Sequence, residues 1–302
     1  MSAIRGPDAF KLCSAATSPA ALLDAATPRD TETPLRRANI ASHALNVLAR
    51  LGTPPAPQSE DERIARLVAQ LHANGICRRL DGRAVSKAAW ALGKLWPYSA
   101  AVPATRVAIT NALTALADCC GSEGNASAGP STAASSGGEP LDAQAVVGVM
   151  HALGLVSGSA PPPPPPPPPP ETLRRLQRRL AMLITARSCA PQDVANGLWA
   201  LAKLGTPVES SLVLALDEHL HQLLNRFKPL ELSTTAWAAT KLQLYPAAEL
   251  GRLVSALHGA LANTEALAGA AAGGKGGKGG KGGKGGEGGG GEGGGGEGGG
   301  GE

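Results

Sequence analysis

The sequence predicts an all-α protein, a right-handed α-solenoid of about five helix-pair repeats of 38 residues, with disordered low-complexity insertions and tail. The first reason is a recurrence: NGLWALAKLG (196–205) and TTAWAATKLQ (234–243) are alike, and they place Trp199 and Trp237 38 positions apart. The second is composition, because Ala and Leu favour helices and are abundant, whereas Phe and Tyr, which favour strands, number two each. The third is that insertions explain the spacing of the weaker copies.

Three weaker copies of the repeat align on the tryptophan position. They retain the helical pattern of small and apolar residues around that position, although only one of them keeps the tryptophan. The copies are VSKAAWALGKLW (85–96) with Trp90, IASHALNVLARLGTPP (40–55) with Asn46, and QAVVGVMHALGLV (144–156) with His151.

Low-complexity tracts account for the irregular intervals between these copies. His151 and Trp199 are 48 positions apart, and removal of the ten consecutive prolines leaves 38. Trp90 and His151 are 61 apart, and removal of the twenty residues 121–140 leaves 41. The tracts are therefore expected to be loop insertions within one array of repeats.

The predicted domain organisation follows from these boundaries. We expect an irregular N-terminal segment, which could serve in targeting, at 1–33, and a helical-repeat domain at 34–264. Low-complexity inserts occupy 121–140 and 161–170, and a disordered Gly-rich tail fills 265–302. These tracts lack the apolar side chains whose burial offsets the loss of chain entropy on folding.

Each repeat is predicted to contain two helices. In the first helix Val194, Leu198 and Leu201 fall on one face, and Gly205 ends the helix as Gly52 ends the first copy. Leu, Ile or Val at helical spacing predict the second helices. These second helices are expected within 62–75, 104–119, 171–186, 210–227 and 249–263.

Two positions of the first helix carry the candidate site. A cation recurs at one position, which we call the phosphate row, and it suits regularly spaced phosphates. A variable polar residue recurs seven positions earlier, which we call the base-reading row, and it suits base edges read one per repeat. The phosphate row is Arg50, Lys94, Lys203 and Lys241, with Leu155 in the weakest copy. The base-reading row is His43, Lys87, Asn196 and Thr234, with Gly148 in the weakest copy.

Each of these features has a structural alternative. A lysine late in a helix also complements the helix dipole, and the tryptophans could pack between repeats rather than stack on bases. Secondary candidates for RNA contact are Arg83, Gln192, Arg174, Arg175 and Arg178, of which the last three belong to LRRLQRRL (173–180) and could equally form a solvated helix face.

The first helix of the fourth copy resembles the octotricopeptide repeat of green algal proteins, which are related to the FAST-kinase-like organellar proteins that often carry a RAP domain. The matching residues are Pro191, Gln192, Asp193, Ala195, Leu198, Trp199, Ala200, Leu201, Lys203, Leu204 and Gly205. The resemblance implies sequence-selective binding of single-stranded organellar RNA. It also implies a role in mRNA or rRNA processing, stability or translation, with other RNA-processing proteins as further partners.

The same resemblance implies localisation in the chloroplast, with the mitochondrion as the alternative. A different class of function stays open, because helical repeats also form scaffolds that bind other proteins. Binding of a single strand should weaken steeply with salt, whereas a protein scaffold should ignore RNA.

The sequence favours neither catalysis nor membrane insertion. It has no Walker-type loop, no HExxH pair and no nucleophile with a base at a known spacing, so an enzyme with a small-molecule substrate is not expected. Its five cysteines have no CxxC spacing, so we expect reduced thiols and no metal or other cofactor. No uncharged apolar run is long enough to span a bilayer.

Overall fold

The computed structural model describes residues 8–29, 32–52, 62–121, 141–158, 168–223 and 226–244, together with positions 255, 256, 259 and 262. Contacts divide the chain into two units, Met1–Leu261 and Ala262–Glu302, and the helices all belong to the first. The described residues form helices and no strand, which confirms the predicted all-helical class.

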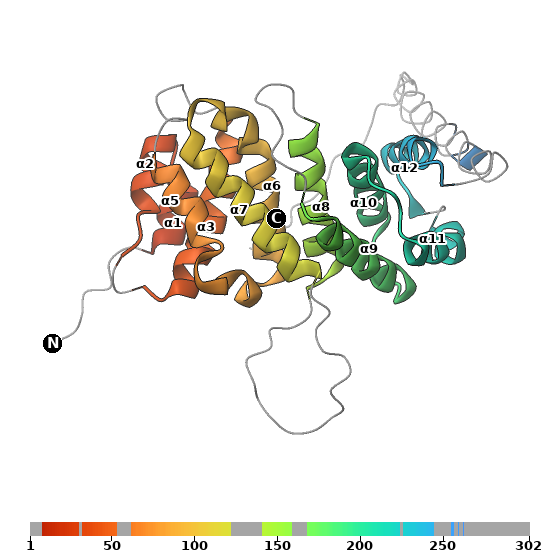
Figure 1. The fold of residues 1–302 in the computed structure, drawn as a ribbon. Coiled ribbons are helices and arrows are strands. Elements are labelled where there is room, and N and C mark those ends of the chain that lie inside the picture. The colour runs from red at the N-terminus through yellow and green to blue at the C-terminus, as the bar shows by residue number, and fades with distance from the viewer. Residues whose placement is uncertain are drawn as a thin grey trace, which may run out of the picture. The chain divides into compact units, whose positions relative to one another are not determined.

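The helices follow one another in chain order across the first unit (Figure 1). They are α1 (Ala9–Ala15), α2 (Pro19–Ala25), α3 (Pro34–Leu51), α5 (Glu62–Gln70), η1 (Ala73–Arg79), α6 (Gly82–Leu95), η2 (Trp96–Ala101), α7 (Pro103–Gly121), α8 (Ala143–Ser157), α9 (Pro170–Thr185), α10 (Pro191–Leu204), α11 (Ser210–Leu223) and α12 (Pro229–Lys241).

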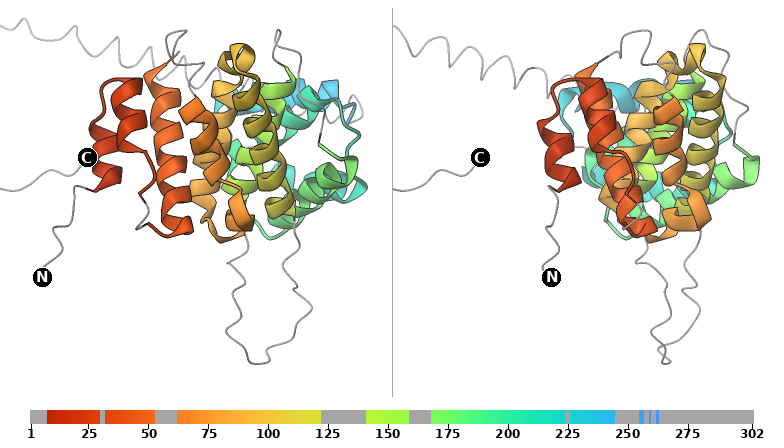
Figure 2. Two further views of the ribbon diagram at one scale, coloured as in Figure 1. Left: turned by 60° about the vertical axis from the view of Figure 1, so that its left-hand side comes forward. Right: turned by 90° about the vertical axis from the view of Figure 1, so that its left-hand side faces the viewer.

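The helices pack in two rows. In the A row, which we define as α3, α6, α8, α10 and α12, each helix packs against the next. In the B row, defined as α5, α7, α9 and α11, the same is true. The rows meet where α3 contacts α5, α7 contacts α6 and α8, and α8 contacts α9 (Figure 2). Because each A-row helix lies beside the A-row helix of the next helix pair, equivalent positions of neighbouring pairs come close together.

Small residues allow the A-row helices to approach closely. A Cβ atom added to Gly154 of α8 would lie 3.0 Å from the Cα of Ala200 in α10. One added to Gly93 of α6 would lie 3.2 Å from the Cα of Ala152 in α8. A side chain at either glycine would press on the backbone of the neighbouring helix and require it to shift, so these glycines allow the close spacing of the A-row helices.

The α10 helix has the apolar face and the end that the sequence predicts. Val194, Leu198 and Leu201 are buried in the core. Gly205 adopts the left-handed conformation that ends a helix, at φ 62°, and Gly52 also has positive φ after α3. The predicted apolar face and the predicted helix end are both confirmed.

Carboxylates cap the N-terminal ends of four A-row helices, α6, α8, α10 and α12, whereas the hydroxyl of Thr33 caps α3. Asp142 accepts a hydrogen bond from the backbone N–H of Ala145 at 2.9 Å, at the start of α8. Asp193 accepts from the N–H of Ala190 at 2.9 Å, and Glu231 accepts from the N–H of Lys228 at 2.8 Å. In α10 and α12, negative charge therefore lies near one end of the helix and the phosphate-row cation, Lys203 or Lys241, at the other, which suits the helix dipole.

A buried amide ties the B row to the loop after α10. Gln177 of α9 is 1 % exposed. Its Nε2 donates to the carbonyl of Pro207 at 3.1 Å, and its Oε1 accepts from the N–H of Glu209 at 2.8 Å. The side chain thus satisfies two backbone groups that α10 and α11 leave without a helical partner.

Two short helices lie within 1–33, the segment expected to be irregular. Both α1 and α2 pack against α3, and Cys13, Leu22 and Leu23 are buried. Asp8 caps α1 by accepting from the N–H of Phe10, and Ser18 caps α2 by accepting from that of Ala21. Each helix has only seven residues, too few for the hydrophobic periodicity that marks the longer helices.

Three element boundaries also differ from those expected. Pro170, the last of the ten prolines, is already the first residue of α9, a position that needs no N–H donor. Gly121 ends α7 rather than beginning the insert. The predicted helix 62–75 stops at Gln70, and Asn74 and Gly75 have positive φ within η1. Of the predicted helix 249–263 only positions 255, 256, 259 and 262 are described, and the tail 265–302 and most of both inserts lie outside the described residues.

Candidate nucleic-acid interface

One face of α10 carries the residues singled out from the sequence. Gln192, Asn196, Trp199 and Lys203 follow one another at spacings of four, three and four, so they lie along one side of the helix. Gly197 lies on the opposite side, where an added Cβ would approach Leu180 of α9 to 2.9 Å. This face of α10 therefore points away from the B row and toward solvent.

Cations and aromatic rings alternate along this face of the A row. The Nζ of Lys203 lies 5.7 Å from the ring centre of Trp199 on its own helix and 5.5 Å from that of Trp237 on α12. The Nζ of Lys94 lies 6.0 Å from the ring centre of Trp90 in α6. These distances are within the range of cation–π attraction.

His151 of α8 bridges the two halves of this arrangement. Its ring centre lies 4.8 Å from that of Trp199, with the planes tilted by 33°. Burial lowers the pKa of His151, and the positive charge of Lys94 lowers it further. We call the resulting set the cation–aromatic stripe. Its members are Trp90, Lys94, His151, Trp199, Lys203 and Trp237.

The tryptophans of the stripe combine core packing with exposure. Trp90 and Trp199 are half-buried and pack against the edge of the hydrophobic core. Trp237 is 43 % exposed, whereas Trp96, outside the aligned position, is fully buried. Core packing therefore covers part of Trp90 and Trp199, and all three aligned tryptophans keep some exposed surface.

The two predicted rows differ in exposure. The phosphate-row cations Arg50, Lys94, Lys203 and Lys241 are exposed, and Leu155 is half-buried. The base-reading row is half-buried throughout, at His43, Lys87, Gly148, Asn196 and Thr234. Exposed charges suit a flexible, solvated backbone, and half-buried polar groups suit closer recognition of a base.

The first copy is partly covered by α1. The Oγ of Ser14 and the Nε2 of His43 share a hydrogen bond of 2.9 Å, and the Phe10 ring centre lies 5.7 Å from that of His43. Burial is the main cause that lowers the pKa of His43, and the positive charges of Lys87 and Arg50 lower it further. His43 thus already contacts α1. The prediction of an irregular segment at 1–33 did not include this contact.

A pocket of about 360 Å³ lies between α8, α10 and α12, on the same face as the stripe. It brings together two members of the base-reading row, Asn196 and Thr234, with the rings of His151 and Trp199. Its lining is His151, Gln192, Ala195, Asn196, Trp199, Lys228, Leu230, Glu231 and Thr234. Lys228 and Glu231 were not identified as site residues from the sequence. The segment KPLE (228–231) indicates only the start of a helix.

The secondary candidates divide between the two rows of helices. Arg83 is exposed on the first turn of α6, in the position equivalent to Gln192 of α10. Three others lie on α9 in the B row, and each is ion-paired. Arg174 lies 2.8 Å from Glu171, Arg175 lies 3.0 Å from Asp118, and Arg178 lies 3.8 Å from Glu209. These ion pairs hold the three arginines against carboxylates of α7, α9 and the segment before α11.

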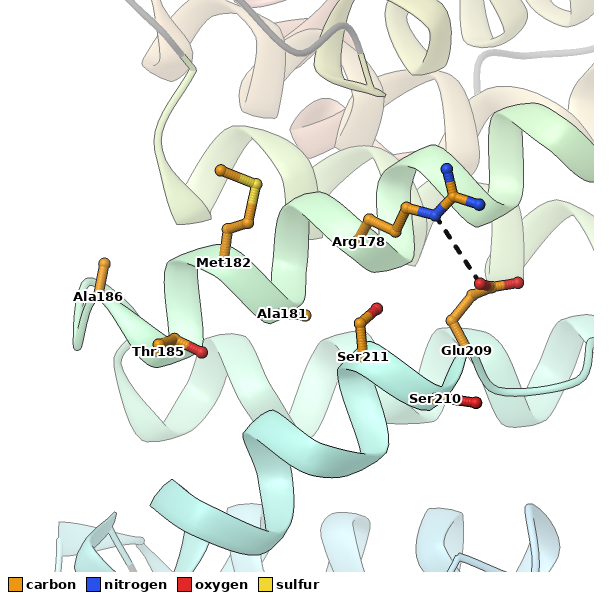
Figure 3. Close-up of a pocket in the computed structure, with 8 residues that line it drawn as sticks. All are labelled: Arg178, Ala181, Met182, Thr185, Ala186, Glu209, Ser210 and Ser211. Carbon is orange, nitrogen blue, oxygen red and sulfur yellow. Dashed lines mark ion pairs between the residues drawn. The ribbon is translucent and has the colours of Figure 1, made fainter. Parts of the chain in front are cut away.

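A larger pocket of about 720 Å³ lies between α9 and α11 (Figure 3). Arg178 points toward Glu209 across one end, and Met182 extends from α9 toward solvent, 49 % exposed. The eight residues that line the pocket include no aromatic ring, and its one cation is already paired. It offers neither stacking nor an unpaired positive charge to a nucleic acid.

The cysteines are free thiols in the structure, as expected. Cys13, Cys77, Cys120 and Cys189 are buried. A hydrogen bond from Cys119 lowers the pKa of Cys77 to about 7, because it stabilises the thiolate form. Among the described residues, no cluster of three His, Cys, Asp or Glu side chains could hold a metal ion, and no helix is long and apolar enough to cross a bilayer.

Comparison with known proteins identifies no relative. The chain matches no protein-family model, no curated protein and no solved structure.

Proposed function

We propose that this chain binds single-stranded RNA along the cation–aromatic stripe. In this proposal the A and B rows form a right-handed α-solenoid of about five repeats, as the sequence period indicates. The RNA is an organellar transcript whose processing, stability or translation the protein supports, in the chloroplast or alternatively in the mitochondrion. The choice of an organellar transcript as ligand rests on the octotricopeptide resemblance. The mode of binding rests on the chemistry of the surface.

The alternation of Trp199, Lys203 and Trp237 is the observation that supports the proposal most. A single strand presents flat bases and charged phosphates in alternation. Indole rings stack on any base, and ammonium groups attract the phosphates between them. Both rings lie within 6 Å of the Lys203 ammonium, so one site of this kind spans two A-row helices.

Recognition of sequence falls to the base-reading row in this scheme. Asn196 and Thr234 differ from Lys87 and His43 in their donors and acceptors, so each helix pair would favour a different base edge. Glycine at 148 offers no side chain, which leaves a position without direct readout.

Reversal of charge on three lysines of the phosphate row tests the proposal. Binding of fluorescently labelled single-stranded RNA to the full chain should weaken by roughly a hundredfold or more in the variant K94E/K203E/K241E, because three attractive charges become repulsive. The matched control is R66E/R79E/R226E, which makes the same change in net charge at exposed arginines outside the stripe. The control should bind nearly as well as the unmodified chain.

Crosslinking in cells extends the same comparison to the natural ligand. We expect crosslinked RNA to be enriched in an organellar transcript with the unmodified chain and the control, and lost with K94E/K203E/K241E. A chain that captures no RNA, or whose capture is unaffected by the reversal of these three lysines, would contradict the proposal. Retention of the same protein partners by the reversed variant would then favour a scaffold.

A further inference from the structure

The pocket between α8, α10 and α12 has the features of a site for one nucleobase. Its volume of about 360 Å³ is near the lower end of ligand pockets, which run from about 300 to 1,000 Å³. The indole of Trp199 and the side chains of Ala195 and Leu230 provide apolar lining. A single flat ring with a polar edge fits a pocket of this size and composition.

The polar lining of this pocket includes one carboxylate. Glu231 is half-buried on the first turn of α12, and its Oε2 accepts the backbone N–H of Lys228 at 2.8 Å. Among the described residues no hydrogen bond or ion pair involves its second oxygen, Oε1. The capping bond holds the carboxylate in place and Glu231 lines the pocket, so Oε1 is the oxygen left to accept a hydrogen bond from a ligand.

A carboxylate is an unusual component of a site for a polyanion. It repels phosphates and can only accept hydrogen bonds, so it contributes favourably only where the ligand presents N–H donors. Lys228 lines the same pocket and is exposed, and Lys203 lies on the adjoining stripe. These cations offset the repulsion of the backbone and leave Glu231 to select the base.

We propose that this pocket selects guanine, with Glu231 as the residue that reads it. The inference rests on the proposed RNA-binding function. Guanine presents two adjacent N–H donors, N1–H and the N2 amino group, and one carboxylate oxygen with two lone pairs accepts both. The Asn196 amide, on the facing helix, donates to the guanine O6. Trp199 covers one face of the ring.

The other bases match these groups less well. Uracil offers a single N–H flanked by two carbonyl oxygens, which would face the carboxylate unfavourably. Adenine and cytosine each offer one amino group beside a ring nitrogen that can only accept. Since an acceptor facing an acceptor leaves both desolvated and unpaired, each of these bases loses affinity in the pocket.

Binding of short oligouridines with one central substitution tests the assignment on the unmodified chain. The central position carries guanine, inosine, adenine or cytosine, and affinity is measured by fluorescence anisotropy. We expect guanine to bind about tenfold more tightly than adenine or cytosine, the discrimination typical of paired hydrogen bonds to a base. Inosine should fall between them, because it lacks the N2 amino group.

The variant E231Q identifies the residue responsible. Its amide oxygen can still cap α12, but it replaces the second acceptor with a donor, so the preference for guanine should drop to about twofold or less. The matched control is D193N, the equivalent cap of α10, which does not line the pocket. It should keep the full preference. Thermal unfolding of both variants verifies that they fold.

The possible outcomes separate the two proposals. If no oligomer binds, including the guanine-containing one, the proposed RNA-binding function is wrong and the guanine assignment with it. If the oligomers bind with equal affinity, or if E231Q retains the preference for guanine, the pocket assignment alone is wrong. Equal affinity for guanine and inosine would also overturn it, because it would show that the N2 amino group is not read.

Discussion

The ammonium group of Lys203 lies 5.5 Å from the ring centre of Trp237, although the two residues belong to different A-row helices, α10 and α12. The same ammonium lies 5.7 Å from Trp199, the residue that aligns with Trp237 in the sequence. Aligned positions of successive helices are thus neighbours in space here. The proposed function depends on this side-by-side placement.

The phosphate row predicts how strongly salt weakens RNA binding. Four cations that each neutralise one phosphate give a slope of about −2.8 in a plot of log affinity against log salt, because single strands contribute about −0.7 per phosphate. The variant K203Q should reduce the slope to about −2.1. The control R66Q, at an exposed arginine of α5, should leave it unchanged. Titrations at several salt concentrations measure both, and an unchanged slope in K203Q would remove Lys203 from the site.

Close approach of α8 and α10 predicts that Gly154 tolerates no side chain. In G154V the new methyl groups would meet the backbone of Ala200, where even a Cβ would lie at 3.0 Å. We expect a loss of about 1–3 kcal/mol in the free energy of unfolding, measured with denaturant. The exposed Gly158, where an added Cβ meets nothing closer than 3.4 Å, provides the control G158V. Equal stability of G154V and G158V would contradict the packing.

Gln177 predicts a second large loss of stability. In Q177L the carbonyl of Pro207 and the N–H of Glu209 lose their partner in a buried environment. The free energy of unfolding should fall by about 2–4 kcal/mol, because two buried backbone groups are left unpaired. The same substitution at the exposed Gln144 of α8 should change it by less than about 0.5 kcal/mol. A small effect at Gln177 would mean that water replaces its hydrogen bonds.

The half-buried histidines predict a loss of stability in weak acid. Burial is the main cause that lowers the pKa values of His43, His72 and His151 below the ordinary 6.5. The unfolded chain therefore takes up protons before the folded chain does. Their contribution to stability is complete above about pH 6.5 and is lost as the pH falls through the lower folded values.

Denaturant unfolding at several pH values between 7.5 and 5.5 measures this loss. The variant H151Q removes one of the three groups and should flatten the dependence of stability on pH. An unmodified chain whose stability rises on acidification over this interval, or an H151Q variant with an unaltered profile, would show that the histidines do not govern it.

The sequence predicted the A-row helices well because their signals are local. Val194, Leu198 and Leu201 repeat at helical spacing, and Gly205 marks the helix end. It did not predict α1 and α2, because seven-residue helices depend on packing against α3 rather than on their own periodicity. Their local signs are the caps Asp8 and Ser18 and the proline at the first position of α2, Pro19.

The sequence could predict the site residues that occupy aligned positions of the repeats. It could not predict which other residues the packing of neighbouring helices brings to the site. Comparing aligned positions identified Asn196 and Thr234, which do line one pocket. Glu231 and Lys228 line it as well, yet in the sequence they mark only the start of α12. The arginines of α9 show the reverse: Arg175 pairs with Asp118, 57 positions earlier, a partner that no local pattern reveals.

The distribution of the four tryptophans gives the protein a built-in optical reporter. Trp96 is fully buried in the core, so its fluorescence emission should respond to unfolding and not to a ligand on the surface. The other three rings flank the proposed ligand, and stacked bases quench indole emission. Ultraviolet excitation of the unlabelled chain would therefore separate occupancy of the surface from loss of the fold in a single spectrum.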